Sequence, residues 1–174
     1  MLYTKKGDDG KTNIFGCNQR LSKSSAITEA LGCLDEINSY LGVVKSKIID
    51  DKNKEIIHRI QNDLFIIQAE VAGADKKIKE EEIKFLEEII SNIEKELPPI
   101  KSFLISGANE ISASFDFART IARRAERRVV AVAEERIEKI DSKTLVFLNR
   151  LSSLLYAFAR LTAMESGAEV SPKY

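Results

Sequence analysis

The sequence predicts an all-α, up-and-down five-helix bundle that carries an extended N-terminal arm. Apolar residues recur every three to four positions through most of the chain, and no segment sustains the alternation typical of a strand. The connections between these periodic segments are short, which favours neighbouring antiparallel helices. A chain of 174 residues is long enough for one domain with a continuous core.

The N-terminal region differs in composition from the rest of the chain. Residues 1–28 are rich in glycine, lysine, threonine and asparagine and lack helical periodicity, so they predict the arm. The helical pattern begins near Ile27, and residues 29–165 are expected to form the bundle. The apolar positions of the first helix are Ile27, Ala30, Leu34, Ile37, Leu41, Val44 and Ile48.

The remaining helices follow from the same periodicity. They are predicted over residues 53–72, 79–96, about 110–137 and about 142–165. The paired prolines in "LPPIK" end the third of the five helices, because proline cannot continue a helix. Ser166 and Gly167 end the last one and leave a polar tail over 166–174.

Charge and composition exclude several classes of partner. Lysine plus arginine and aspartate plus glutamate each total 27, so no net charge draws the whole chain to nucleic acid or to a membrane. No stretch approaches the roughly 20 apolar residues that cross a bilayer. The two cysteines form neither a metal-ligand spacing nor a disulfide framework. We therefore expect a cytoplasmic protein whose anion affinity is confined to a local site.

The segment "FARTIARRAERRVV" at 117–130 places five arginines within ten positions of a predicted helix. Their i,i+4 repulsions together cost that helix about 1 kcal/mol. Arg119, Arg123 and Arg127 form one stripe beside the apolar face, whereas Arg124 and Arg128 project on the other side. A solvated basic face is one interpretation. An anion site is the other, because guanidinium groups match phosphate and carboxylate oxygens.

Two further regions carry candidate polar groups. In "TKKGDDGKT" at 4–12, glycines let backbone N–H groups converge on an anion while lysines and threonines add donors. A flexible basic terminus is the alternative there, and Arg20 and Lys23 continue its basic character. Asp35 lies beside the apolar stripe of the first helix and is either an ordinary exposed aspartate or the partner of an arginine. His58 is the single histidine, which excludes histidine-based triads and di-iron sites.

Four segments together resemble a known family. "YTKKGDDGKTNIFG…RLSK", "EALGCLDEINSYLG", "ARTIARRAERRVV" and "FLNRLSSLLYAFAR" resemble, in that order, the blocks of ATP:cob(I)alamin adenosyltransferases of the propanediol-utilisation (PduO) type. The resemblance covers about half the chain and leaves residues 45–100 without a motif. It implies a helical bundle that forms a homotrimer, with active sites between subunits.

The resemblance also implies a reaction. The 5′-deoxyadenosyl group of ATP would pass to cob(I)alamin, giving adenosylcobalamin and triphosphate, with Mg²⁺ sharing the phosphate charge. A cob(II)alamin reductase and an adenosylcobalamin-dependent enzyme would be partners. The alternative function is a non-enzymatic helical oligomer that binds nucleotide or another polyanion as a sensor.

Site residues are carried over motif by motif. The implied ATP site comprises Thr4, Lys5, Lys6, Gly7, Asp8, Gly10, Thr12, Lys23, Arg123, Glu126, Arg127 and Asn149. Arg123 and Glu126 would act in catalysis with Phe103, which corresponds to a phenylalanine that packs beneath the corrin and excludes its lower axial ligand. Asp35 and Arg119 would form a salt bridge at the subunit boundary, and no protein ligand of a metal is assigned.

Three positions depart from the family pattern. Ser106-Gly107-Ala108 replaces a Pro-Gly-Gly turn, Asp116 replaces a frequent histidine, and Leu151-Ser152-Ser153 replaces Leu-Ser-Asp. The first two departures lie near the expected corrin side, whereas the expected ATP elements are intact.

Overall fold

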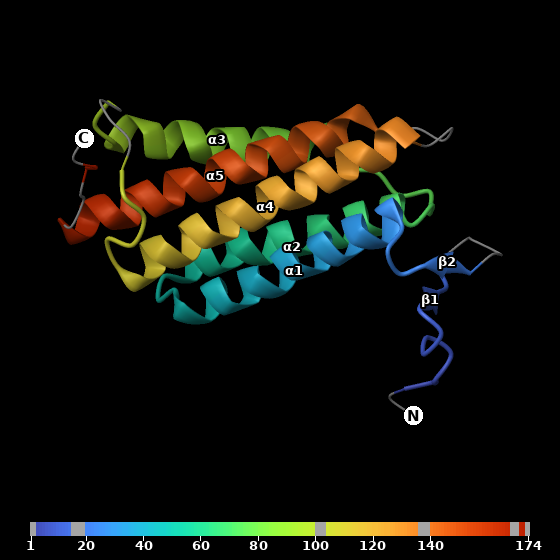
Figure 1. Cartoon of the computed structure of the whole chain (residues 1–174). Helices are drawn as coiled ribbons and strands as arrows, with labels where there is room; N and C mark the ends of the chain where they lie inside the picture. Colours follow the sequence, from blue (N-terminus) through green and yellow to red (C-terminus); the bar gives the residue numbers. More distant parts are fainter. Residues whose placement is uncertain (1–2, 15–19, 100–103, 136–139, 168–170, 173–174) are drawn as a thin grey trace.

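A computed structural model describes residues 3–14, 20–99, 104–135, 140–167 and 171–172. Its five helices are α1 (Ala26–Lys47), α2 (Asp51–Val71), α3 (Glu80–Glu96), α4 (Glu110–Glu135) and α5 (Ser142–Ser166). Each helix runs opposite to the one before it in the chain (Figure 1). The predicted all-α, up-and-down bundle is therefore confirmed.

The observed helix boundaries differ from the predicted ones by a residue or two, for local reasons. α2 begins at Asp51 because the Asp50 carboxylate accepts a hydrogen bond of 2.8 Å from the backbone N–H of Asn53. The Asp141 carboxylate caps α5 in the same way through the N–H of Lys143. α5 ends where Gly167 adopts a left-handed backbone with φ 65°.

The helices are not packed in chain order. α1 packs against α2 and α4, and α5 packs against α4 and α3, so the main packing contacts run in the lateral order α2–α1–α4–α5–α3. α4 therefore lies between α1 and α5, with a neighbour on each flank. α3 runs parallel to α5, its main packing partner.

The core is apolar and receives side chains from every helix. Among the largest fully buried side chains are Leu34, Ile37, Leu41, Ile57, Ile60, Leu64, Ile67, Leu86, Phe115, Phe147 and Leu148. Burial of each such side chain stabilises the fold by about 1.5–3 kcal/mol. α4 contributes the small residues Ala118, Ala122 and Ala125, all fully buried, which let its backbone approach both neighbours closely.

A buried carboxylate ties α2 to the start of α5. Glu70, at the end of α2, accepts hydrogen bonds from the backbone N–H of Asp141 at 2.9 Å and from the Thr144 hydroxyl. A negative charge is favourable at the N-terminus of a helix because the unpaired N–H groups there carry partial positive charge. This contact sets where α5 begins and so the position of Asn149 two turns along.

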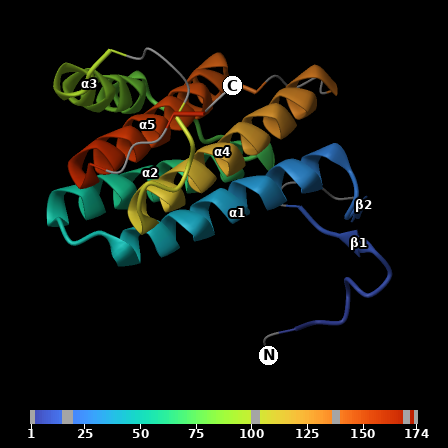
Figure 2. The same ribbon diagram turned by 60° about the vertical axis from the view of Figure 1, so that its left-hand side comes forward.

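The arm contains a short antiparallel hairpin that the sequence pattern did not predict. β1 (Lys11–Thr12) pairs with β2 (Leu21–Ser22), with Lys11 opposite Ser22. Strands of two residues are too short to produce an alternating pattern, so period-based analysis misses them. The arm leaves the bundle at the start of α1 and projects away from the helices in both views (Figures 1 and 2).

None of the helices in the described ranges is long and apolar enough to cross a membrane.

A second buried carboxylate, Asp63 on α2, is not held by hydrogen bonds in the way that Glu70 is. It is 4% exposed, and its Oδ2 atom has no hydrogen-bond partner within the described part of the chain. Burial, followed by the nearby charge of Glu82, raises the pKa of Asp63 to about 7. Glu82 itself accepts a hydrogen bond of 2.7 Å from Arg59 Nε.

The raised pKa predicts a stability that declines with pH. Folded Asp63 retains a proton that the unfolded chain releases near pH 4, so its contribution is fully present below about pH 4 and is lost as pH rises through about 7. We expect Asp63→Asn to melt higher than wild type at pH 8.5 and to lose most of that advantage at pH 5. Thermal denaturation at both pH values measures this.

Asp75→Asn, at an exposed aspartate in the α2–α3 connection, is the matched control and should leave the pH dependence unchanged. A melting-temperature difference between Asp63→Asn and wild type that is the same at pH 5 and pH 8.5 would contradict the assignment.

Candidate functional site

The arm folds into a loop held by backbone and lysine contacts. Lys5 and Gly10 adopt left-handed backbone conformations with φ 62° and 77°, which turn the chain back on itself. Lys23 Nζ donates to the Gly7 carbonyl at 2.7 Å, and the Lys23 N–H donates to the Gly10 carbonyl at 2.9 Å. A Cβ atom on Gly7 would lie 3.1 Å from Lys23 Nζ, so a side chain there would press on this lysine.

The predicted arm residues therefore belong to one folded unit. These residues are Thr4, Lys5, Lys6, Gly7, Asp8, Gly10, Thr12 and Lys23. Most of them are exposed, and the loop carries several lysine ammonium groups. Such a surface suits an anion with several oxygens.

The arginines of α4 divide into a free set and a paired set. Arg123 and Arg127 are exposed, and Arg127 Nη1 donates to the backbone carbonyl of Arg123 at 3.0 Å. The sequence placed these two beside the buried face, but they point outward. α1 and α5 cover the flanks of α4 and leave this side open within the described chain. No carboxylate of the described residues pairs with either guanidinium.

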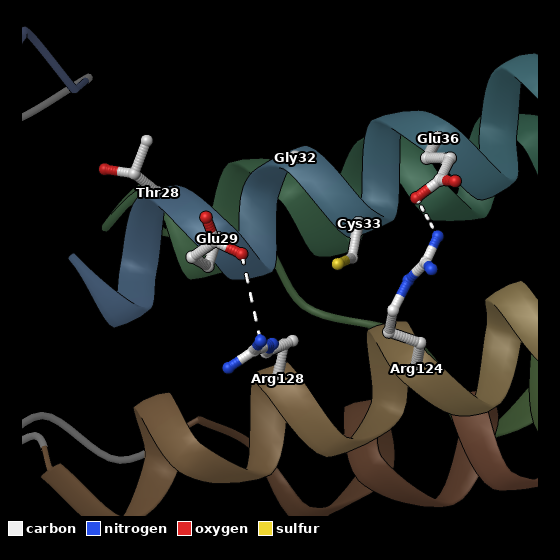
Figure 3. Close-up of a pocket in the computed structure, with 7 residues that line it drawn as sticks. All are labelled: Thr28, Glu29, Gly32, Cys33, Glu36, Arg124 and Arg128. Atoms are coloured by element: carbon white, nitrogen blue, oxygen red, sulfur yellow. Dashed lines mark hydrogen bonds and ion pairs between the residues drawn. The ribbon is translucent and has the colours of Figure 1, made fainter. Parts of the chain in front are cut away.

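Arg124 and Arg128 point to α1 instead. Arg124 forms an ion pair with Glu36, and Arg128 lies 3.9 Å from a carboxylate oxygen of Glu29 (Figure 3). The two pairs span a cleft of about 370 Å³ between α1 and α4, into which the Cys33 thiol points. The cleft is lined by Thr28, Glu29, Gly32, Cys33, Glu36, Arg124 and Arg128. None of these is a residue that the motifs assigned to the ATP site.

Glu126 and Asn149 are brought together at the seam between α4 and α5. Asn149 Nδ2 donates to Glu126 Oε1 at 3.0 Å, and Asn149 Oδ1 accepts from Arg150 at 2.9 Å. Arg150 also donates to Glu87 on α3 at 2.8 Å. The hydrogen-bond partner of Glu126 is therefore Asn149. Three helices thus hold this pair in place next to the outward-facing Arg123.

Arg119 is half-buried and has a partner on its own helix. Its Nε donates to Asp116 at 2.9 Å, and its guanidinium lies 5.9 Å from the centre of the Tyr156 ring. Asp35 is exposed on α1 and takes part in no ion pair among the described residues. A single chain does not test a salt bridge between subunits, so the Asp35–Arg119 pair stays a prediction.

The predicted site residue Phe103 lies outside the residues that the structure describes. Within the described ranges, no group of three or more histidine, cysteine, aspartate or glutamate side chains could hold a metal ion.

The arm and the helical residues form two half-sites. No hydrogen bond or ion pair in the described chain joins the arm to Arg123, Glu126, Arg127 or Asn149. The arm also projects away from the bundle (Figure 2). One half-site offers lysines and backbone around a glycine-rich loop. The other offers two arginines, with no carboxylate partner in the part of the chain that the structure describes, beside a carboxylate–amide pair.

Arg20 is not among the ATP-site residues that the motifs imply, yet its side chain makes several hydrogen bonds in the arm. Its guanidinium donates to both carboxylate oxygens of Asp9, at 2.7 and 2.8 Å. A basic residue after a Gly-Asp-Asp-Gly stretch could have indicated an ion pair. Arg20 and Asp9 are 11 positions apart, however, and only the hairpin brings them together.

These features define a helical-bundle protein with two cationic half-sites suited to a polyphosphate. Residues 2–162 match a family model described as cobalamin adenosyltransferase, and the chain belongs to that family.

Curated relatives agree with this family. The chain is 37% identical over 187 residues to the corrinoid adenosyltransferase PduO of Salmonella typhimurium, covering 99% of this chain and 54% of the relative. It thus spans about half the length of that relative. It is also 37% identical over 175 residues to a corrinoid adenosyltransferase of Bacillus subtilis, covering 95% of this chain and 88% of the relative.

Solved structures extend the similarity to three dimensions. A variant of the PduO-type ATP:corrinoid adenosyltransferase from Lactobacillus reuteri, complexed with cobalamin and ATP, matches with a TM-score of 0.90 and 33% identity. That match covers 100% of this chain and 96% of the other. Another variant of the same enzyme, complexed with ATP, matches with a TM-score of 0.86 and 34% identity over 99% of both chains.

Proposed function

We propose that this protein transfers the 5′-deoxyadenosyl group of ATP to cob(I)alamin, forming adenosylcobalamin and triphosphate. The observation that carries the proposal is that Arg123 and Arg127 face outward, without a carboxylate partner among the described residues, in a chain of this family. Two like charges four residues apart on a helix are unfavourable without an anion to share. The triphosphate of ATP is such an anion. We place the reaction in the cytoplasm.

The chemistry explains why the site is cationic and why the protein need not activate a nucleophilic side chain. Co(I) supplies the electron pair that forms the cobalt–carbon bond, and the bond between C5′ and the triphosphate oxygen breaks. The protein therefore has to hold C5′ in line with cobalt and stabilise the charge that grows on the leaving group. Positioning and preorganised cations supply both.

The helical half-site offers groups for each task. Arg123 is the donor aimed at the leaving triphosphate. Glu126 and Asn149, held by their mutual hydrogen bond of 3.0 Å, offer an acceptor and an amide to the rest of the nucleotide. Thr4, Lys5, Lys6 and their neighbours in the arm would enclose the phosphates from the other side.

Mg²⁺ fits this site only as an ion carried by the phosphates. The described residues provide no cluster of three acidic, histidine or cysteine ligands. Mg²⁺ commonly keeps several waters and binds through substrate phosphates with one or two carboxylates. When bound, it neutralises part of the triphosphate charge, while the lysines and arginines of the chain supply the remainder.

The decisive experiment is a direct assay of the reaction. The full chain is mixed with ATP, Mg²⁺ and chemically reduced cob(I)alamin, and the spectrum of adenosylcobalamin is followed, with a sample lacking ATP as control. Enzyme-dependent formation of adenosylcobalamin and triphosphate is the expected result. Binding of ATP without any product would instead identify a nucleotide-binding sensor.

Arg123→Ala should reduce turnover far more than stability. Loss of one aimed donor at a leaving group lowers kcat on the order of 10²–10³-fold. The melting temperature should hold or rise slightly, since the change removes a like-charge neighbour of Arg127. Steady-state kinetics and thermal denaturation measure the two effects. Arg59→Ala, at a remote ion pair on α2, is the control, and near wild-type kcat in Arg123→Ala would refute the role.

We also propose that the protein is a homotrimer whose sites close between subunits. Among the described residues no hydrogen bond or ion pair joins the two half-sites, and we propose that a neighbour's arm completes each site. The face formed by α1 and α4 also carries an apolar surface. Phe117 is 54% exposed, and its ring packs edge-on against that of Tyr40, with the ring centres 5.0 Å apart. Val43 on α1 is exposed as well. A neighbouring subunit would cover this surface, and Asp35 lies on the same helix as Tyr40.

If Asp35 and Arg119 pair across that boundary, Asp35→Asn and Arg119→Ala should each weaken activity and trimer formation. The double variant should lose less than the sum of the two, because the pair is lost only once. Kinetics and analytical ultracentrifugation provide the measurements. Asp51→Asn, at the exposed ion pair with Lys54 on α2, is the control and should change neither measurement. Additive losses, or a stable and active wild-type monomer, would argue against the interface.

Phe103→Ala should impair reduction of the corrinoid more than the transfer step. The ring is proposed to exclude the lower axial ligand, and Co(II) without that ligand is easier to reduce. We expect a large deficit when a cob(II)alamin reductase supplies the electron, a smaller one with pre-reduced cob(I)alamin, and an almost unchanged Kd for ATP. Equal deficits in both assays with a lowered melting temperature would indicate a core phenylalanine instead.

A further inference from the structure

The loop at the start of the arm, residues 3–13, buries little of its surface. Every residue of this loop is exposed except Gly7 and Thr12, which are half-buried. Its sheet has only two residues in each strand, and an isolated two-stranded hairpin is marginal in water. Lys5 also holds a left-handed backbone conformation that a residue with a side chain seldom adopts. Ile14, directly after this loop, is buried in the core, and Leu21 of β2 packs against the core. Burial therefore anchors the base of the hairpin, whereas the exposed loop has to be held by polar contacts.

Arg20 adds a second set of contacts to those that Lys23 makes with Gly7 and Gly10. Its Nη1 and Nη2 atoms donate to the two oxygens of Asp9 at 2.7 and 2.8 Å. Nη2 also donates to the backbone carbonyl of Lys11 at 3.1 Å and to that of Lys6. One guanidinium thus links three points of the loop, on both sides of the turn at Gly10.

Asp9 completes this clasp. Its Oδ1 atom accepts a hydrogen bond of 3.1 Å from the backbone N–H of Lys11, in addition to the bond from Arg20. The hydrogen bonds from Arg20 and then from Lys11 hold the pKa of the Asp9 carboxyl below its usual value. The planar fork of arginine suits a bidentate carboxylate, whereas the single ammonium of lysine does not.

The clasp also separates Arg20 from the anion-binding groups. The positive charge of Arg20 is matched by Asp9 inside the arm. Lys5, Lys6 and Lys11 take part in no ion pair among the described residues, and the loop presents them to solvent. Arg20 is therefore placed to shape the loop, and the lysines to meet a phosphate.

We propose that Arg20 is a positioning residue that, through Asp9, Lys6 and Lys11, preorganises the arm for the triphosphate of ATP. The inference rests on the proposed function. A loop already ordered before binding loses less conformational entropy when ATP arrives, so the clasp contributes to affinity without touching the ligand. Its loss should raise the Kd for ATP and leave the transfer step at saturating ATP unchanged.

The first test is the Kd of ATP with Mg²⁺ in the absence of corrinoid, measured by calorimetry on the full chain. Arg20→Lys keeps the charge but cannot form the clasp, and we expect a Kd on the order of tenfold higher, equivalent to about 1.4 kcal/mol. We expect kcat at saturating ATP and the KM for cob(I)alamin to stay within twofold of wild type. The melting temperature should not change. Arg59→Lys, at the ion pair with Glu82, is the matched control.

The substitution Asp9→Asn distinguishes two roles of Arg20, phosphate ligand and positioning residue, because they change the affinity for ATP in opposite directions. It removes a negative charge and releases Arg20. If Arg20 were a phosphate ligand, ATP would bind more tightly to Asp9→Asn. If Arg20 positions the loop, ATP binds more weakly, by about the same factor as in Arg20→Lys, and the double variant is no weaker than either single one.

Hydrogen exchange supplies a readout independent of activity. The backbone amides of Lys11 and Lys23 should exchange faster in Arg20→Lys and Asp9→Asn, while those of the helices do not change. Tighter ATP binding by Asp9→Asn, additive losses in the double variant, or an unchanged Kd despite faster exchange would each overturn the proposal. A wild-type chain that does not bind ATP would refute the proposed function instead, which keeps the two failures distinct.

Discussion

The structure depends on the burial of α4 between α1 and α5. Its alanines at 118, 122 and 125 are fully buried and let two helices approach its backbone closely. With both flanks covered, the charged residues of α4 can occupy only the seams and the outer surface. The arginine-rich composition is therefore tolerated because the small apolar face supplies the packing energy, at roughly 25 cal/mol for each Å² of apolar surface removed from water.

The same packing sorts five arginines of one sequence motif into different roles. Arg124 and Arg128 meet carboxylates of α1, so their charge is compensated within the chain. Arg123 and Arg127 lie on the open side, where among the described residues no carboxylate pairs with them. The neutral balance of the whole chain hides this local separation of charge. A polyanion would find its partners at the open side of α4 and in the lysine-rich arm, and not across the whole surface.

The residues of the candidate site could be proposed from the sequence because they occur in short contiguous motifs. The glycine-rich arm and the arginine helix were identified from the chain alone, and family membership followed from the same blocks. Contacts between distant segments could not be found in this way. The Asn149–Glu126 hydrogen bond and the Arg20–Asp9 clasp each join residues more than ten positions apart. Their formation depends on helix register or hairpin pairing that no local pattern encodes.

By itself, the sequence determined the number, limits and alternating direction of the helices, since 3.6-residue periodicity, prolines and capping residues act locally. It also determined which residue types are available for binding an anion. Only the tertiary structure decided the lateral order α2–α1–α4–α5–α3, because side-chain packing, and not chain connectivity, selects which faces meet. It likewise decided that Arg123 faces outward while Arg124 is paired, since adjacent helical positions differ by about 100° and a neighbour on one flank reaches only one of them.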